Sequence, residues 1–312
     1  MIPIQISQLR NVTRDIPFDI YLKVAPDNFV HVFSRTTGID YKRLAQYVQK
    51  GVGELFIRAE DKPAFEEFVS KPAHVLFRDP NVPKEKKIAA LLNMTEQNMA
   101  ELFSQLDVTE QTAQDTERVV KGYATLLSEN PTTLALMLRL VAHGEYLYYH
   151  TIAVSVFSML IAKGLGKLPQ AETETLGFGA FMHDIGLGET ELTTEEAERQ
   201  DHPRAGLKLL EANPTIGREV RSIVYQHHEE PAGTGYPNQL SGPAIYYPAK
   251  IVGVADAFSE LISRRGERAA LPVHEVMRRL FDGAKLGKFD LEIVQTAEKV
   301  FLPSISIGKK AA

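Results

Sequence analysis

The sequence of 312 residues is long for one compact domain and sufficient for two, and its apolar fraction of 44% can supply a sizeable core. A formal net charge of -5 without a basic tract argues against a partner such as long nucleic acid, although a local group of arginines or lysines could hold a small anion. Cysteine is absent, which excludes disulfides and thiolate metal sites and is typical of a reducing cytosol.

No secretory signal or membrane span is expected. The first residues, MIPIQISQLR, lack the basic-then-apolar pattern of a signal peptide. Residues 146–162 are almost uninterrupted apolar sequence, but they are fewer than the roughly 20 that a span needs, and they include His150 and several hydroxyl side chains. We therefore predict a buried helix here and a cytoplasmic protein.

Residues 1–80 are predicted to form a small α/β domain. Short β-type runs occur at 18–24 (FDIYLKV), 29–35 (FVHVFSR) and 53–59 (GELFIRA), and helical spacing of apolar residues occurs at 41–51 and 62–70. This region has neither a His/Asp/Glu cluster nor a glycine-rich phosphate loop. It is expected to be a regulatory or partner-docking domain that binds a protein partner.

From residue 81 onward nearly everything is predicted to be helical. The segment RDPNVPKEKK, at 78–87, indicates a boundary, and residues 81–117 are assigned to a helical linker within one or two long polar helices over 84–129. Asn130 and Pro131 are typical of the start of a helix running to His143. Residues 118–312 are predicted to form an all-α domain, with helices near 145–164, 170–182, 204–212, 215–229, 247–263, 272–284 and 290–301. The fold class is α+β overall, mainly all-α.

A series of five histidines and two aspartates lies in the predicted helical domain. Neutral imidazole and carboxylate groups are good ligands for iron, zinc or manganese. A carboxylate beside a histidine can also bridge two ions. The series therefore predicts a two-metal site, which is suited to the hydrolysis of phosphate esters. The seven residues are His150, His183, Asp184, His202, His227, His228 and Asp256.

Each of these residues is ambiguous when it is taken alone. His150 in an apolar helix can be a hydrogen-bonded core residue, and the pair His183–Asp184 before Gly186 can be a helix cap. His202 precedes a proline and is expected at a helix start, with its ring facing a cleft. Asp256, in an otherwise apolar helix, needs a cation or hydrogen-bond donors, because a buried unpaired carboxylate is costly. The metal prediction depends on the whole set.

Four motifs in this order resemble the HD-GYP proteins, a bacterial branch of the HD superfamily of metal-dependent phosphohydrolases. They are HDIG at 183–186, the HP..G...L pattern from His202, HHE at 227–229 followed by GTGYP at 233–237, and VADAF at 254–258. The resemblance covers roughly residues 118–305. It implies a helical HD-type bundle and the hydrolysis of cyclic di-GMP or a related cyclic dinucleotide, with a hydroxide between the two ions as nucleophile.

The resemblance also implies two divalent ions, with iron favoured and manganese or another transition metal allowed. One ion takes His150, His183, Asp184 and Asp256, and the other takes Asp184, His202, His227 and His228, so that Asp184 is the bridge. Some relatives have a glutamate, a ligand for a third ion, one turn before the first histidine. This chain has Tyr146 there and Glu145 one step away. Two ions are therefore expected.

The motifs expected to face the substrate depart from the family pattern. Leu187 replaces the usual lysine after HDIG, and Ala232 replaces an aspartate before the Gly-Tyr-Pro motif. In the segment after the VADAF helix the proline and tyrosine are gone, and Glu267 is one of the altered residues. Arg265 and Arg268 remain as candidate phosphate-binding residues, with a solvated surface as the alternative. Tyr236 either faces the ligand or anchors its loop by packing, and packing is favoured.

Three functions follow as hypotheses. The complete ligand set favours a phosphodiesterase, whereas the altered substrate motifs favour a weakly active or inactive metal-bound receptor or scaffold acting through residues 1–80. A different nucleotide phosphohydrolase of the HD superfamily is a third possibility, against which the Gly-Tyr-Pro motif argues.

Overall fold

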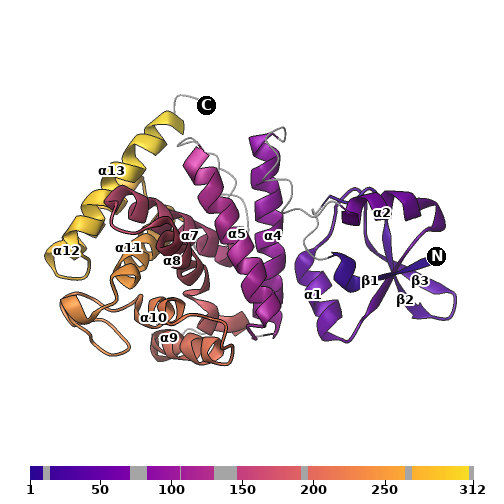
Figure 1. The fold of residues 1–312 in the computed structure, drawn as a ribbon, viewed down its shortest axis with the longest axis horizontal. Helices are drawn as coiled ribbons and strands as arrows, with labels where there is room; N and C mark the ends of the chain where they lie inside the picture. Colours follow the sequence, from indigo (N-terminus) through magenta and orange to yellow (C-terminus); the bar gives the residue numbers. More distant parts are fainter. Residues whose placement is uncertain are drawn as a thin grey trace. The chain divides into compact units, whose positions relative to one another are not determined.

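The chain has two compact units, Met1–Gln105 and Leu106–Ala312, shown in Figure 1. The structure is a computed structural model that describes residues 1–9, 15–70, 83–105, 107–129, 146–190, 196–263 and 269–308. A small unit with a sheet precedes a larger helical unit, and the predicted α+β class is confirmed. Because the unit boundary is at 105/106, it falls inside the segment 81–117 that the sequence had assigned to a linker.

The first unit contains a four-stranded antiparallel sheet in the order β1-β4-β2-β3. Its core includes apolar side chains from the sheet and from the segment before β2, with Phe18, Ile20, Leu55 and Ile57 fully buried. The three predicted strands are present, and β1 is an additional strand at one edge of the sheet. The strands are β1 (Ile2–Gln5), β2 (Ile20–Ala25), β3 (Asn28–Phe33) and β4 (Glu54–Ile57).

The helices of this unit are α1 (Tyr41–Gln49), α2 (Lys62–Ser70) and α4 (Lys84–Gln105). The Asp40 side chain caps α1 by accepting a hydrogen bond from the Arg43 amide at 3.0 Å. Helix α4 packs on α1, and its Ala100 belongs to the core of this unit. Burial of the apolar face of α4 therefore places it in the first unit.

The second unit is helical. Its helices are α5 (Glu110–Glu129), α7 (Tyr146–Leu165), α8 (Gln170–Met182), the 3-10 helix η3 (Ile185–Thr190), α9 (Glu196–Glu211), α10 (Arg218–Gln226), α11 (Tyr247–Ile262), α12 (Val273–Lys285) and α13 (Leu291–Gly308). Helix α7 packs against α8 and α11, and α10 packs against α8, α9 and α11. The helix expected after Asn130 lies outside the described residues. In the part of the chain that the structure covers, no helix is both long and apolar enough to cross a membrane.

One predicted helix start is wrong. His202 and Pro203 lie inside α9, which begins at Glu196. A proline costs a helix one backbone hydrogen bond, but the residues preceding it, including Glu196, Ala197 and Gln200, are good helix formers. The helix therefore continues through the proline, and the His202 side chain is presented from an inner turn.

Candidate metal centre

The helical unit brings all seven predicted ligand residues together. They come from five helices: α7, the end of α8, α9, the end of α10, and α11. His150, His183, His202, His227 and Asp256 are buried, and Asp184 and His228 are partly buried. His183 and His227 each occupy the position where a helix ends, so Asp184 and His228 follow where the chain turns. The predicted convergence at helix ends is therefore present.

The side chains form two groups of possible metal ligands. Within each group the candidate ligand atoms lie within 4.8 Å of one another. One group contains Asp184, His202, His227 and His228, and the other contains His150, His183 and Asp256.

Asp184 lies between the two groups. Its Oδ2 is 3.3 Å from Nε2 of His183 and 3.8 Å from Nε2 of His150. Its Oδ1 is 3.1 Å from Nε2 of His202 and 3.8 Å from Nε2 of His227. The two carboxylate oxygens thus face different sets of imidazoles, which is the geometry of a bridging carboxylate.

Backbone contacts direct the lone pairs of two imidazoles toward the cluster. Nδ1 of His183 lies 2.7 Å from the Ala180 carbonyl, and Nδ1 of His227 lies 2.7 Å from the Val224 carbonyl. A carbonyl can only accept a hydrogen bond, so each Nδ1 carries the proton and leaves Nε2 as a ligand atom. The buried His183 Nε2 has no hydrogen-bond partner among the described residues. A cation fits this orphaned atom.

Two further contacts support the same interpretation. The Nε2 atoms of His202 and His227 lie 3.1 Å apart, and lone pairs that face each other need a proton or a cation between them. His150 directs Nε2 toward Oδ1 of Asp256 at 3.1 Å, while its Nδ1 lies 3.1 Å from the Ser259 hydroxyl. Ser259 is fully buried and fixes the orientation of this ring.

The electrostatics favour a charged Asp184 carboxylate and neutral imidazoles at His227 and His228. Burial raises the pKa of Asp184, but His183 and His202 outweigh this effect and hold the pKa well below its usual value. Burial lowers the pKa of His227 well below its usual value and that of His228 to about 4. For His183, burial lowers the pKa, but Asp184 and Asp256 reverse this and raise it to about 9. Without a metal ion, a proton therefore supplies positive charge at His183.

Two glycines allow the close backbone approaches around the cluster. A Cβ at Gly186 would lie 2.1 Å from the His202 carbonyl oxygen and 2.5 Å from the Gly206 nitrogen, so only glycine lets η3 pack this tightly on α9. A Cβ at Gly235 would lie 2.4 Å from the His228 carbonyl oxygen. The glycines of HDIG and GTGYP thus bring their segments against the helices that carry the ligands.

The loop after α10 is held over the cluster by a residue to which sequence reasoning assigned no role. The buried Glu229 carboxylate accepts hydrogen bonds from the Asn238 and Leu240 amides, both at 2.7 Å. The Tyr236 ring lies 4.6 Å from the His228 ring, centroid to centroid, with an interplanar angle of 30°. Tyr236 thus packs on a ligand residue. The motif HHE includes Glu229, but the sequence does not show which backbone amides bind its carboxylate.

The other predicted substrate residues are placed as follows. Arg265, Arg268 and Glu267 lie outside the described residues, as does Glu145. Tyr146 is the first residue of α7, one turn before His150. Leu187 lies in η3.

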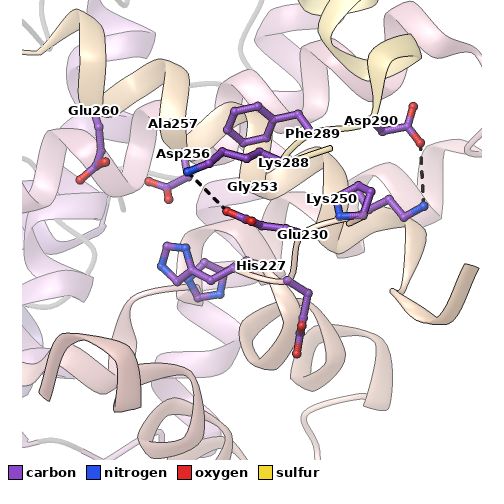
Figure 2. Close-up of a pocket in the computed structure, with 13 residues that line it drawn as sticks. His227, Glu230, Lys250, Gly253, Asp256, Ala257, Glu260, Lys288, Phe289 and Asp290 are labelled. Atoms are coloured by element: carbon purple, nitrogen blue, oxygen red, sulfur yellow. Dashed lines mark ion pairs between the residues drawn. The ribbon is translucent and has the colours of Figure 1, made fainter. Parts of the chain in front are cut away.

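A cavity of about 160 Å³ lies beside the cluster, and its lining is shown in Figure 2. His227, His228 and Asp256 form one part of the lining. The rest is polar or charged, apart from a few apolar residues, and comprises Glu229, Glu230, Pro231, Lys250, Gly253, Ala257, Glu260, Lys288, Phe289 and Asp290. A small polar ligand can therefore reach the cluster through this cavity.

The helical unit gathers five imidazoles and the Asp256 carboxylate around the shared Asp184 carboxylate, a donor set that can hold divalent metal ions. Residues 150–293 match the family model described as an HD domain. This part of the chain is similar to the HD superfamily, and the predicted resemblance to the HD-GYP proteins is confirmed. The His/Asp cluster of this domain can hold divalent metal ions.

Several curated relatives are similar to part of this chain. The chain is 27% identical over 180 residues to the cyclic di-GMP phosphodiesterase PA4108 of Pseudomonas aeruginosa, covering 54% of this chain and 43% of the relative. It is 33% identical over 133 residues to the cyclic di-GMP phosphodiesterase response regulator RpfG of Xanthomonas campestris, covering 39% and 35%. It is 26% identical over 181 residues to the 3'3'-cGAMP-specific phosphodiesterase 1 of Vibrio cholerae, covering 53% and 41%. The chain thus spans less than half the length of each.

A solved structure shares the fold over nearly the whole chain. Bd1817, described as an HDG"Y"P protein from Bdellovibrio bacteriovorus, has a TM-score of 0.68 at 20% identity and covers 96% of this chain and 98% of its own. The likeness supports the fold, with the helical HD-type bundle preceded by a small α/β part.

Proposed function

We propose that this protein is a metal-dependent phosphodiesterase that hydrolyses cyclic di-GMP or a related cyclic dinucleotide. The observation that carries the proposal is the position of Asp184, whose two oxygens face two separate sets of imidazoles. Relatives named as cyclic di-GMP and 3'3'-cGAMP phosphodiesterases support this class of substrate.

The residues fit two divalent ions. His150, His183 and Asp256 would hold one, the group formed by His202, His227 and His228 would hold the other, and Asp184 would bridge them. We propose iron, with manganese as the alternative for the same donor set. When bound, the ions would lower the pKa of water to make a nucleophile and would neutralise charge on the phosphate.

The protein residues contribute orientation and exclusion of water. The backbone carbonyls of Ala180 and Val224 fix the rings of His183 and His227, so these ligands are oriented before an ion arrives. Tyr236 packs on His228 and holds the loop beside the cavity, where the substrate would enter.

The test compares wild type with two aspartate variants. Protein loaded with Fe²⁺ without oxygen is incubated with cyclic di-GMP or 3'3'-cGAMP, and linear dinucleotide and GMP are measured. Asp184→Asn should abolish turnover and lower the metal content. Asp201→Asn should leave both unchanged, because Asp201 is 65% exposed on α9 and pairs only with Arg204 among the ion pairs of the described residues.

The outcomes separate enzyme from receptor. Turnover by wild type with about two ions per chain supports the proposal. Dinucleotide binding without turnover would instead support a metal-bound receptor. Equal turnover in Asp184→Asn would refute the assignment of the bridge.

We also propose a regulatory or partner-docking role for residues 1–80. Among its described residues the metal-ligand clusters are absent, since both groups lie in the helical unit. Deletion of residues 1–105, the whole first unit, should leave the metal content unchanged while altering the response of the activity to a partner.

A further inference from the structure

The wall of the cavity opposite the ligand residues is formed by the turn between α12 and α13. This turn is joined to the loop after α10 by the Ala232 amide, which donates a hydrogen bond to the Gly287 carbonyl at 2.8 Å. Nζ of Lys288 lies 3.7 Å from Oε1 of Glu230, and the dashed line in Figure 2 marks this ion pair. The ammonium group of Lys288 is therefore presented at the cavity that the ligand residues also line.

Lys288 is the lining cation that an anion can recruit most readily. Its side chain is 54% exposed and its pair with Glu230 is long, and ion pairs of this kind contribute little stability. The other lining lysine, Lys250, is only 12% exposed and pairs with Asp290 at 3.8 Å. A phosphate that enters the cavity can therefore replace Glu230 as the partner of Lys288 with little loss.

The ring of Phe289 fixes the position of this turn. A Cβ at Gly283 would lie 2.8 Å from Cε2 of Phe289, so the ring packs directly on α12. Because its neighbour is held in this way, Lys288 is carried on an anchored turn.

A cyclic dinucleotide contains two phosphodiester groups, and the metal centre can hold only the one that reacts. The second phosphate needs a cation from elsewhere, and Leu187, where the resemblance led us to expect lysine, cannot supply one. Leu187 is also not among the residues that line the cavity. The structure offers Lys288 instead, from a different element.

We propose that Lys288 binds the second, non-reacting phosphate of the substrate, which replaces Glu230 as the partner of the lysine. The inference rests on the proposed phosphodiesterase function. It assigns to this chain a specificity residue for substrates with two phosphates.

The experiment uses three variants of the full-length, metal-loaded protein. Lys288→Met removes the charge and keeps most of the side-chain length. Lys285→Met is the matched control, because Lys285 is 74% exposed at the end of α12, pairs with Asp282 and does not line the cavity. Glu230→Gln breaks the ion pair and keeps Lys288.

Two substrates and one binding measurement are compared. Bis(4-nitrophenyl) phosphate has a single phosphodiester, so its kcat/KM reports on the metal centre, whereas that of cyclic di-GMP also reports on the second phosphate. Calorimetric titration with a phosphorothioate analogue of cyclic di-GMP measures binding without turnover.

Lys288→Met should raise the KM for cyclic di-GMP and the Kd of the analogue about tenfold, as expected for one lost charge-assisted hydrogen bond. Its kcat should change much less, and its kcat/KM for cyclic di-GMP should fall relative to that for bis(4-nitrophenyl) phosphate. Lys285→Met should match wild type, and Glu230→Gln should not raise KM.

Unchanged KM and Kd in Lys288→Met would overturn the inference. An equal rise in KM in Glu230→Gln would also overturn it, because the pair would then act only as a clamp between two loops. A wild type that hydrolyses neither substrate would refute the proposed function, while the Kd values would still test Lys288. A wild type that neither hydrolyses cyclic di-GMP nor binds the analogue would refute both.

Discussion

Replacement of Glu229 by glutamine should loosen the loop that covers the metal centre. The carboxylate accepts two backbone hydrogen bonds of 2.7 Å, from Asn238 and Leu240. Glutamine can accept one of them through its oxygen, but its amide group then faces the second N–H, and two donors cannot pair. The variant thus loses a charge-assisted hydrogen bond and leaves a polar group unsatisfied.

The magnitude follows from these two effects. A hydrogen bond to a charged group contributes about 1.5–3 kcal/mol, and an unsatisfied buried donor costs a similar amount. We expect the free energy of loop opening to fall by about 3 kcal/mol, which corresponds to a factor of roughly 100 in the opening equilibrium. The amides of Asn238 and Leu240 should therefore exchange about 100-fold faster with deuterium.

Hydrogen exchange of loop peptides followed by mass spectrometry is the assay. Turnover of cyclic di-GMP should fall as well, because Tyr236 moves with the loop and no longer packs on His228. The matched control is Glu211→Gln, an exposed carboxylate near the end of α9. Unchanged exchange in Glu229→Gln, or equal acceleration in the control, would refute this account of the loop.

Three further predictions concern the cluster itself. Metal-free protein should lose about 3 kcal/mol of its free energy of unfolding between pH 6.5 and 9, as measured by denaturant titration. The reason is that the folded protein raises the pKa of His183 to about 9. The stabilisation by protonated His183 is therefore complete below pH 6.5 and is lost as the pH rises toward 9. A pH-independent stability would contradict the charge balance at His183. Gly186→Ala should lower the thermal midpoint of the helical unit strongly, since its Cβ would meet the His202 carbonyl, whereas Gly53→Ala has open space and serves as the control. Ser259→Ala should weaken metal binding by roughly 10–100-fold in chelator competition, and wild-type affinity would show that the hydroxyl does not orient its ligand ring.

The sequence predicted that these seven side chains converge, because several of their positions follow from local rules. An apolar helix that ends at His183 and an amphipathic helix that ends at His227 each place the next side chain at a turn, and both features are visible in a single segment. His202 shows the limit of this reasoning. Its proline indicated a helix start, but the helix-forming residues before it extend α9 to Glu196.

Contacts between distant segments could not be predicted. The first residues did not indicate a strand, because β1 is four residues long, includes Pro3 and is stabilised by pairing with β4, whose residues are far away in the sequence. The partner of Lys288 is a similar case. A charge in a loop has no periodicity that identifies its partner, so the ion pair between Lys288 and Glu230 emerges only from the fold.

The two parts of the site are supported by different physical means, and this explains where the chain departs from the family pattern. The ligand residues are fixed by helix packing and buried hydrogen bonds, so losing one leaves a buried charge uncompensated. Lys288 lies in the turn between α12 and α13, and surface turns tolerate a change of charge at little cost in stability. Leu187 lies in η3 and does not line the cavity, so under the proposed function Lys288 presents a positive charge at the cavity that Leu187 cannot. The altered motifs would then change the selection of substrate without removing the chemistry of the metal centre. If Lys288→Met weakens binding of cyclic di-GMP while Asp184→Asn removes metal, the two functions are separable in this chain.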